Sequence, residues 1–502
     1  MRLLLVPALL TRAASVGDEA DFGTPWLPEL PVGASSPWSA VALELNRSVA
    51  ALGLENDGPE VILSRMVAPK HARNRVIIRD GRVVVERSFL AESKRKMHMN
   101  VLTSILAFFK DKPLADIIYL HEPTSSGLTQ TRDAPTTVIA KKDGYDMPGI
   151  LVPNCYFGPH GRVFDRWQSI VKKIVMHAKM NEWNKRDERV FWRGEVTWKG
   201  NRSTFDRKTN GTLSESAYFK NCKRLAGQFA RMDAISLTFN NDEAQIFDVR
   251  CNKGCSVDGV VACERNYDFD AALRRFLERP DVGLDDKYYK EHEYTRYQFQ
   301  LNLPGKTMGS YSRNLNHLWF TGSVVLMWNA PYTEFYYPAL HHGQNFVSIN
   351  KTTIAKTVKH IKENAQLRTN LINNAQRIGD SLVCPKCIAS YMQLVIETLR
   401  NYFRFREILD DKEKSDTFYT KYMPCSRNDD LSLMEITFHP DSDKKPVQER
   451  PISCDDWLRW TPRLEPPDES PIDEPFLPDL PPDDDDHVFT HEVKIIDAPP
   501  LE

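Results

Sequence analysis

Short stretches of alternating or continuous apolar residues recur along most of the chain and predict a series of strands. Two of them, Arg75–Arg79 and Arg82–Glu86, flank Asp80-Gly81, a dipeptide typical of the two-residue turn of a β-hairpin. Further strands are predicted at residues 115–120, 137–140, 189–192, 297–301 and 324–328.

Apolar residues spaced three and four positions apart predict helices around and between these strands. They cover residues 38–54, 99–110, 167–183, 217–232, 313–320, 354–378 and 389–405. Alternation of strand and helix over this length predicts an α/β architecture with parallel sheets. Because such sheets bind ligands at the carboxyl ends of their strands, the loops that follow strands are the candidate functional segments.

The composition is that of a globular protein and excludes a polytopic membrane protein. The 502 residues are 41% hydrophobic and 27% charged, and no apolar run approaches the roughly 18 residues of a membrane span. Residues 465–502 carry 13 acidic side chains, one lysine and nine prolines, which predicts a disordered acidic tail. The tail has a net charge of −12 and the whole chain −2, so the remainder carries +10. That balance suits an anionic ligand without indicating nucleic acid.

The N-terminus and the cysteines favour the secretory pathway, in the endoplasmic reticulum or Golgi lumen. Arg2 precedes an apolar stretch, residues 3–10, that resembles a short secretory signal interrupted by Pro7. Four Asn-x-Ser/Thr acceptors begin at Asn46, Asn201, Asn210 and Asn350. The nine cysteines are scattered, which favours structural disulfides. Free core thiols, and a metal or redox role for Cys384 and Cys387, are the alternatives.

The segment at residues 296–327 predicts one complete βαβ unit with a glycine-containing loop. Ser310 or Ser312 can cap the helix that follows this loop. Arg313, in the first turn of that helix, is unfavourable for the helix dipole unless an anion such as a diphosphate binds there. The alternative is an ordinary capped helix with a solvated arginine. The P-loop spacing and the Gly-x-Gly-x-x-Gly fingerprint are absent, which disfavours a nucleoside triphosphatase and a nicotinamide dehydrogenase.

Two further loops carry side chains suited to a sugar nucleotide. Arg193, Gly194 and Glu195 come directly after a predicted aromatic strand, and Arg202 follows shortly afterwards. We expect a flexible turn there, whose arginines bind phosphate through paired hydrogen bonds. Glu334 follows another strand among tyrosines, where its carboxylate could accept hydrogen bonds from ribose. A solvated surface turn and an aromatic segment packed on the core are the respective alternatives.

Several segments share their order and spacing with one known family. They are Ile150-Leu-Val-Pro-Asn154-Cys-Tyr-Phe157, Phe191-Trp-Arg-Gly194, Gly309-Ser-Tyr-Ser312 continuing to Leu318-Trp-Phe-Thr-Gly-Ser-Val-Val-Leu326, Tyr332-x-Glu334-Phe-Tyr-Tyr-Pro-Ala-Leu340, and the helix at residues 391–402. Together they resemble the protein O-glucosyltransferase family, which includes fungal capsule-associated proteins and animal enzymes that add glucose or xylose to secreted protein modules. The likeness spans about residues 110–405, and the order and spacing of the pieces argue against chance agreement.

The resemblance implies a GT-B fold, in which two Rossmann-like domains face each other across a cleft. It divides the chain into an N-terminal extension (1–60), an acceptor-side domain (61–180), a nucleotide-sugar domain (181–380), C-terminal helices that pack back on the body (381–464) and the acidic tail (465–502). It implies a UDP-sugar as donor substrate, a secreted protein module or a polysaccharide as acceptor, and no bound metal or cofactor. No nucleic-acid partner is expected.

The resemblance also assigns residues to the donor. Arg193, Gly194, Glu195 and Arg202 would line the diphosphate and sugar, and Ser310, Ser312, Arg313 and Asn314 would contact the nucleotide, together with Glu334 from the third loop. The chain departs from the family here in two respects. The arginine after Ser312 comes one position early, and Glu195 stands where the family often has serine.

The catalytic base is the largest departure. The family has an aspartate two residues before a proline, after a strand, and here that place is held by His121-Glu122-Pro123. The reaction needs a base that deprotonates an acceptor hydroxyl as it attacks the anomeric carbon. We favour Glu122, followed by His121, whereas Asp133 lies too late in the sequence. The alternative is an inactive homologue that binds nucleotide or glycan.

Overall fold

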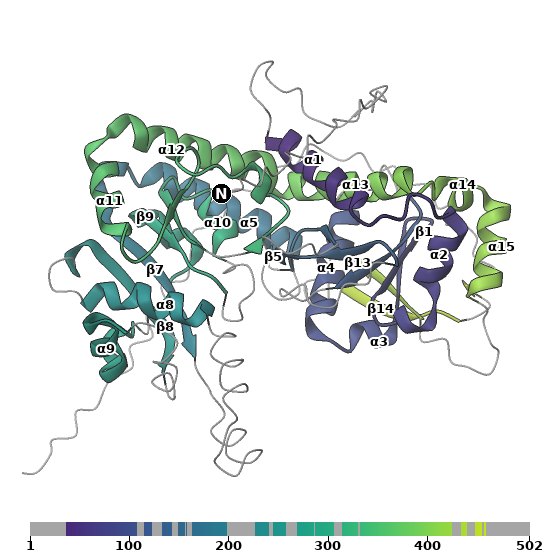
Figure 1. The fold of residues 1–502 in the computed structure, drawn as a ribbon, viewed down its shortest axis with the longest axis horizontal. Coiled ribbons are helices and arrows are strands. Elements are labelled where there is room, and N and C mark those ends of the chain that lie inside the picture. Colours follow the sequence, from purple (N-terminus) through teal and green to yellow (C-terminus); the bar gives the residue numbers. More distant parts are fainter. Residues whose placement is uncertain are drawn as a thin grey trace, which may run out of the picture. The chain divides into compact units, whose positions relative to one another are not determined.

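The computed structural model describes residues 37–107, 115–122, 133–142, 149–155, 157, 163–197, 226–239, 244–257, 269–285, 287–305, 314–329, 332–423, 433–438, 447–453 and 456–457. The chain divides into two units, residues 1–460 and 461–502, and the second lies outside the described residues. Within the first unit the fold is mixed α/β, with two main sheets (Figure 1). The predicted α/β class is therefore confirmed.

The first sheet has seven strands in the order β14-β13-β2-β1-β3-β4-β6. Their bounds are β1 Arg75–Arg79, β2 Arg82–Glu86, β3 Ile117–Glu122, β4 Thr136–Val138, β6 Ile150–Leu151, β13 Leu433–Phe438 and β14 Val447–Pro451. The sheet is mixed, because β3, β4 and β6 pair in parallel whereas the other neighbours are antiparallel. The prediction of parallel sheets is therefore wrong for this half of the fold.

The predicted hairpin forms as expected. Asp80 and Gly81 have φ angles of 49° and 70°, the left-handed pair that a type I′ turn requires, and Arg79 pairs with Arg82 across it. On the other edge of β2 the chain adds β13. There the buried carboxylate of Glu435 accepts hydrogen bonds from Arg82 and Arg450. Helices alone were expected in this C-terminal region, so these two strands are a correction.

The second sheet has five strands in the order β12-β10-β9-β7-β8, all parallel. Their bounds are β7 Asp187–Thr197, β8 Phe247–Ser256, β9 Tyr297–Asn302, β10 Val324–Trp328 and β12 Val347–Ile349. Strands β9 and β10 lie where the sequence predicts them. Strand β8 was not predicted from the sequence, although Phe247, Val249 and Cys251 alternate with Asp248 and Arg250 as they do in a strand. A parallel sheet with helices is consistent with a Rossmann-like arrangement.

The helices cover both sheets. Their bounds are α1 Pro37–Ala50, α2 Pro59–Val67, α3 Arg87–Leu90, α4 Ser93–Ala107, α5 Val163–Met180, α8 Ala226–Ser236, α9 Ala271–Glu278, α10 Leu315–Leu318, α11 Ile354–Glu363, α12 Ala365–Ile378, α13 Pro385–Tyr402, α14 Arg406–Leu409 and α15 Lys412–Tyr422. Helices α2, α3 and α4 pack on the first sheet, while α8 packs on β7 and β8 and α12 packs on β10 (Figure 1).

The single helix predicted over residues 354–378 forms as two helices, α11 and α12. The pattern over residues 354–378 breaks at Asn364, whose φ of −113° and ψ of 89° end α11. Its side chain then caps α12 by accepting a hydrogen bond from the backbone N–H of Leu367, at 2.9 Å. The apolar periodicity continues through the break because both helices bury the same side against the sheet core. Periodicity alone therefore could not reveal the boundary.

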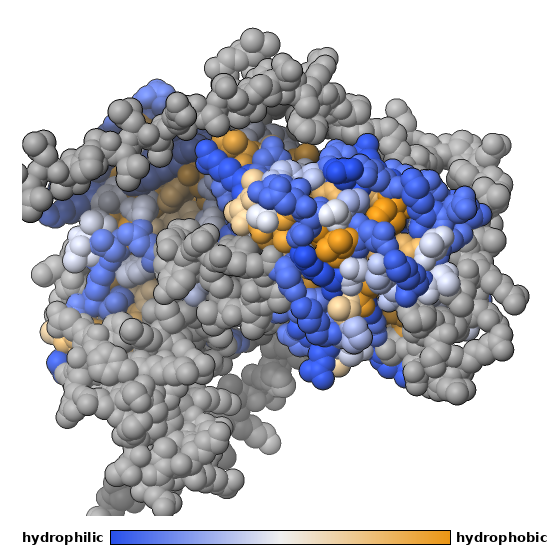
Figure 2. Space-filling view, turned by 45° about the vertical axis from the view of Figure 1, so that its right-hand side comes forward, coloured by the Kyte–Doolittle hydropathy of each residue, from blue (hydrophilic) through white to orange (hydrophobic). Residues whose placement is uncertain are grey.

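No single helix among the described residues is long and apolar enough to cross a membrane. Residues Ala365–Val383 and the helix Pro385–Tyr402 pass by length and composition only as a pair bent by 54°. Their apolar residues belong to the protein core, and they include Ala375, Ile378, Leu382, Val383, Ile388, Ala389, Tyr391, Met392, Val395, Ile396 and Leu399. On the face shown in Figure 2, hydrophilic residues (blue) surround smaller hydrophobic areas (orange).

Within the described part of the chain, two pairs of cysteines form disulfides, Cys251–Cys255 and Cys384–Cys387. The expectation that cysteines form disulfides is confirmed for these pairs. Each bond closes a loop of only a few residues, so it restricts the unfolded chain less than a long-range crosslink would.

Candidate functional site

The proposed base residues lie at the end of β3. The strand extends two residues beyond its predicted end, so His121 and Glu122 belong to the sheet and pair with Thr137 and Val138 of β4. His121 is completely buried. Its ring stacks on that of His98 from α4, with 3.6 Å between ring centroids. Residues 123–132, including Pro123, lie outside the described residues.

Hydrogen bonds assign the tautomer of His121. Its Nδ1 lies 2.8 Å from the hydroxyl of Thr137, and that hydroxyl donates to the carbonyl of Leu120 at 3.2 Å. We therefore assign the ring proton to Nδ1, which leaves Nε2 with a free lone pair. Nε2 has no hydrogen-bond partner among the described residues. Burial lowers the pKa of His121 well below its usual value, and the charges of His98 and Arg95 lower it further, so the imidazole is neutral near neutral pH.

Glu122 is also buried, with 4% of its surface exposed. Its carboxylate lies 3.9 Å from Nη2 of Arg95, whose positive charge compensates for the loss of water. Asp133, the rejected candidate, instead forms an ion pair with Lys70 at 2.6 Å. The structure thus brings His121, Glu122 and Arg95 together at one strand end.

The flexible turn expected at Arg193–Glu195 does not exist. These residues continue β7, with Arg193 opposite Arg250 and Gly194 opposite Cys251 of β8, and a register shift follows Gly194. The reason is tertiary, because β8, which was not predicted from the sequence, supplies a parallel partner along this part of β7. The glycine is required by packing, since a Cβ at Gly194 would lie 2.3 Å from the ring of Trp192.

Arg193 is held by carboxylates. Its guanidinium is 2% exposed and donates to Oδ1 of Asp248 at 2.9 Å and to Oδ2 of Asp285 at 2.7 Å. Burial opposes its charge, but the two carboxylates more than compensate and raise the pKa of Arg193. Its other N–H groups donate to the backbone carbonyls of Trp192 and Asp248. A phosphate at this position would have to displace one of these partners.

Of the other residues predicted to contact the donor substrate, only some lie within the described part of the chain. Asn314 donates from its side chain to the carbonyl of Arg193 at 3.2 Å, so the structure brings these two together. Glu195 contributes its carbonyl, which accepts from Arg231 at 2.6 Å. Ser310, Ser312, Arg313 and Arg202 lie outside the described residues. The helix that follows Asn314, α10, has only four residues, whereas the sequence predicted a longer one.

Glu334 lies directly after β11, a two-residue strand (Tyr332–Thr333) that pairs with β5 (Lys141–Lys142). Its side chain is 1% exposed, and Oε2 accepts a hydrogen bond from Nδ2 of Asn154 at 2.9 Å. Burial raises its pKa well above the usual value, and the bond from Asn154 opposes this only in part. Burial therefore favours the neutral, protonated form of Glu334.

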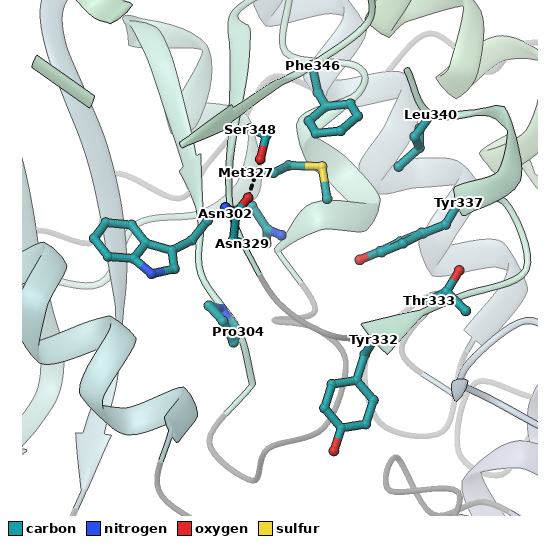
Figure 3. A pocket seen from close by; sticks show the side chains of 11 residues that line it. Asn302, Pro304, Met327, Asn329, Tyr332, Thr333, Tyr337, Leu340, Phe346 and Ser348 are labelled. Atoms are coloured by element: carbon teal, nitrogen blue, oxygen red, sulfur yellow. Dashed lines mark hydrogen bonds between the residues drawn. The ribbon is translucent and has the colours of Figure 1, made fainter. Parts of the chain in front are cut away.

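A cavity of about 260 Å³ opens at the carboxyl ends of β9, β10 and β12 (Figure 3). Its lining side chains are Asn302, Pro304, Met327, Trp328, Asn329, Tyr332, Thr333, Tyr337, Leu340, Phe346 and Ser348. Asn329 and Ser348 are hydrogen-bonded to each other. Asn302 is buried, and its Oδ1 has no partner among the described residues. Residues 302–304 and 327–329 directly follow or end predicted strands, which is the signal that could have identified them.

The pocket combines aromatic rings with amides and hydroxyls, and none of the described residues that line it has a charged side chain. Rings offer flat apolar contact, and an amide both donates and accepts hydrogen bonds. This chemistry suits a planar base or a sugar ring better than a phosphate. The volume is smaller than the roughly 300–1,000 Å³ of pockets for drug-sized ligands, so it fits part of a sugar nucleotide.

Comparison with known protein families identifies the class of protein to which the matched segment belongs. Residues 256–455 match the sequence profile of Glycosyl transferase family 90. The chain carries a glycosyl transferase family 90 domain. No curated protein matches the chain. A family 90 glycosyltransferase moves a sugar from a donor to an acceptor, so the resemblance seen in the sequence is confirmed at the level of the family.

The family 90 domain contains the pocket, Asn314 and Glu334, whereas Arg193 and the end of β3 precede the matched residues. Within the described residues, no three His, Cys, Asp or Glu side chains gather as a metal site. The individual roles assigned to Glu122, His121, Arg193 and the other site residues stay predictions.

Proposed function

We propose that this family 90 glycosyltransferase moves glucose or xylose from a UDP-sugar to a hydroxyl of a protein module or glycan, within a GT-B arrangement. The pocket carries the proposal. It lies at the carboxyl ends of three parallel strands, inside the matched domain, and it is lined by rings and amides suited to a nucleoside or sugar. The all-parallel second sheet supports a Rossmann-like donor half, as a GT-B fold requires.

The proposed chemistry is removal of a proton from the acceptor hydroxyl as it attacks the anomeric carbon, with UDP as the leaving group. Glu122 is the first candidate base, with Arg95 beside it. His121 is the second, since its neutral ring has an unshared pair on Nε2. Both are buried, so the acceptor would have to reach them as the site opens or closes.

Donor binding by the pocket can be tested with UDP and calorimetry. We expect Asn302→Ala to weaken UDP binding by roughly tenfold or more, because the deleted amide leaves a polar ligand group unpaired. Asn370→Ala is the matched control, because Asn370 is exposed on α12 and its side chain bonds only to Gln366 among the described residues. Equal binding by wild type and Asn302→Ala would remove the pocket from the donor site.

The base can be tested by release of UDP from a panel of UDP-sugars with a hydroxyl acceptor. We expect Glu122→Gln to lower kcat by about 10²-fold or more and to leave UDP binding intact. His121→Ala is measured alongside, and loss in that variant alone would name histidine as the base. Glu182→Gln, at an exposed position, serves as the matched control.

One observation favours a second candidate, an inactive nucleotide- or glycan-binding homologue. The family's aspartate is replaced by a histidine that is completely buried and neutral. A binding protein would retain UDP and turn over no donor, and Glu122→Gln and His121→Ala would both leave its affinity unchanged. The two assays above therefore separate the candidates.

The secretory pathway is the proposed location. Disulfides support it, because they persist in oxidising compartments. Asn46 is exposed on α1 and Asn350 in the turn before α11, so both acceptors are accessible to a glycan. Treatment of the cell-derived protein with an endoglycosidase should increase its electrophoretic mobility, and an unchanged mobility in an Asn46→Gln, Asn201→Gln, Asn210→Gln, Asn350→Gln variant would identify these sites.

A further inference from the structure

Glu334 lies within the wall of the pocket without facing solvent. Tyr332, Thr333 and Tyr337, which line the cavity, come from the same short segment. Figure 3 shows these three side chains along one side of the pocket. Oε2 of Glu334 accepts from Asn154, whereas Oε1 has no hydrogen-bond partner among the described residues. The carboxyl group thus faces the protein interior, and its neighbours in sequence face the ligand space.

The partner of Glu334 belongs to the other sheet. Asn154 follows β6 at the edge of the seven-stranded sheet, and it is completely buried. Its Oδ1 accepts a hydrogen bond from Nδ2 of Asn316 in α10, at 3.4 Å. Three buried polar side chains therefore connect a segment of the first sheet, the helix after β9 and the pocket wall. Polar groups are buried at a cost unless they are hydrogen-bonded, so this connection restrains all three segments.

Apolar contacts hold the same segment next to this connection. Phe335 stacks on Tyr391 of α13, with 4.7 Å between ring centroids, and packs edge-on against Phe157. The hydroxyl of Tyr391 donates to the carbonyl of Leu151 at 2.8 Å. Thr333 pairs with Lys141 of β5. The wall of the pocket is therefore attached on several sides to residues from the first half of the chain.

Among the described residues, no cation pairs with the Glu334 carboxyl group to favour its ionised form. Tyr336 of the same segment interacts with it electrostatically and is itself buried. Titratable groups on the other packed elements include Tyr391 of α13, His317 of α10 and Lys141 of β5. Lys141 is directed to Ser48 and Glu44 of α1. A carboxylic acid in such a place acts as a hydrogen-bonding group of fixed shape.

We propose that Glu334 is a positioning residue, which acts through its hydrogen bond with Asn154 to hold Tyr332 and Tyr337 in the wall of the pocket. This inference rests on the proposed function, in which that pocket takes part of the donor. It differs from the sequence-based prediction that the Glu334 carboxylate accepts hydrogen bonds from ribose. In the proposed role the side chain touches the protein and not the ligand.

The decisive experiment compares Glu334→Gln, Glu334→Ala and Asn154→Ala for UDP affinity and for donor KM and kcat. Glutamine keeps the shape and the acceptor oxygen, so it should stay within about twofold of wild type. Each alanine variant should weaken UDP binding and raise donor KM by about tenfold to hundredfold, as expected for a displaced wall. The double variant should be no worse than either single variant, because both remove the same connection.

The opposite pattern would overturn the inference. If Glu334→Gln weakens UDP as much as Glu334→Ala does, the charged carboxylate contacts the donor itself. If both alanine variants bind UDP like wild type, the connection does not position the wall. His360→Ala, at an exposed position on α11, is the control for handling of the variants.

A second measurement works even if no UDP-sugar is bound or the alanine variants fold poorly. Thermal unfolding of wild type and Glu334→Gln is followed from pH 4 to pH 8. A buried neutral acid loses stability as pH rises above the pKa of about 4.3 that glutamate has when unfolded, whereas glutamine does not. The difference in Tm should therefore open in favour of Glu334→Gln as pH rises. A constant difference would show that Glu334 is ionised in the fold and would overturn the inference, whereas absent UDP binding would overturn only the proposed function.

Discussion

Arg193 and Glu334 are both buried ionisable residues that the sequence suggested as ligand contacts, yet the fold accommodates them in opposite ways. Arg193 keeps its charge because Asp248 and Asp285 approach to 2.9 and 2.7 Å. Glu334 has, among the described residues, only the amide of Asn154 as a hydrogen-bond partner, at 2.9 Å, and burial raises its pKa well above the usual value. At both places, burial of the charged form costs free energy because the group loses its contact with water. The difference teaches that nearby counter-charge, and not residue type, decides whether a buried group stays ionised.

The largest expected effect is at the paired charge. Arg193→Met leaves the buried carboxylate of Asp248 without its closest partner, so we expect the free energy of unfolding to fall by about 3–5 kcal/mol. Denaturant unfolding at pH 7 measures it. Arg296→Met, whose side chain is 58% exposed and paired only with Glu293 among the described residues, is the control. A loss below about 1 kcal/mol at Arg193 would contradict the role of the ion pairs.

The next effect concerns a buried histidine, whose pKa burial lowers. Burial lowers the pKa of His98 to about 3, whereas an unfolded histidine titrates near 6.5. The unfolded chain thus binds a proton that the folded chain does not, and stability falls as pH drops from about 6.5 towards 3. For His98→Phe, which keeps a ring against His121, we expect the decline to be weaker by about 1.4 kcal/mol per pH unit below pH 6. If the stability of wild type and variant changed with pH in parallel, His98 would take up its proton in the folded state as readily as in the unfolded chain.

A smaller effect tests whether the glycine beside Arg193 serves packing. Gly194→Ala places a Cβ 2.3 Å from the Trp192 ring, which must shift, so we expect a loss of about 1–3 kcal/mol in unfolding free energy. Because the Trp192 ring must shift, the tryptophan fluorescence of the protein should also change. Gly58→Ala is the matched control, because a Cβ there meets no atom within 4 Å. Equal stability of the two variants would mean that Trp192 moves freely.

The smallest expected effect is at an exposed pair of charges. Nζ of Lys362 in α11 lies 3.0 Å from Oε2 of Glu188 in β7, and the two side chains are 32% and 67% exposed. Lys362→Ala should cost about 0.2–1 kcal/mol, and less in high salt, because water screens the pair. If Lys362→Ala lowered the free energy of unfolding as much as Arg193→Met does, burial would not explain the difference between the exposed and the buried ion pair.

Local features of the fold were predictable from the sequence. The hairpin at Asp80-Gly81 and the strands β9 and β10 lie where the apolar pattern places them, because short-range sterics and alternation determine them. The break at Asn364 and the strand β8 were missed. At Asn364 the apolar stripe continues through the break and hides it. The strand β8 does show apolar residues in alternation at Phe247, Val249 and Cys251, but the pattern is short and was overlooked.

The candidate site was predictable only in part. The motifs around Asn154 and Glu334 were recognised separately as family segments, but nothing in the sequence indicated that these two side chains hydrogen-bond each other. Asn302 and Ser348 of the pocket were missed because no single side chain there has distinctive chemistry. They form a pocket only because β9, β10 and β12 end at the same edge.

The sequence by itself determined the family, several of the strands and helices, and the hairpin turn, because these depend on neighbouring residues and on motifs read in order. Tertiary structure alone decided that Arg193 lies in a strand between two carboxylates, and that Glu334 is a buried acid hydrogen-bonded to a residue 180 positions away. Ionisation and pairing depend on what surrounds a side chain in space. The chain brings those surroundings together only when it folds.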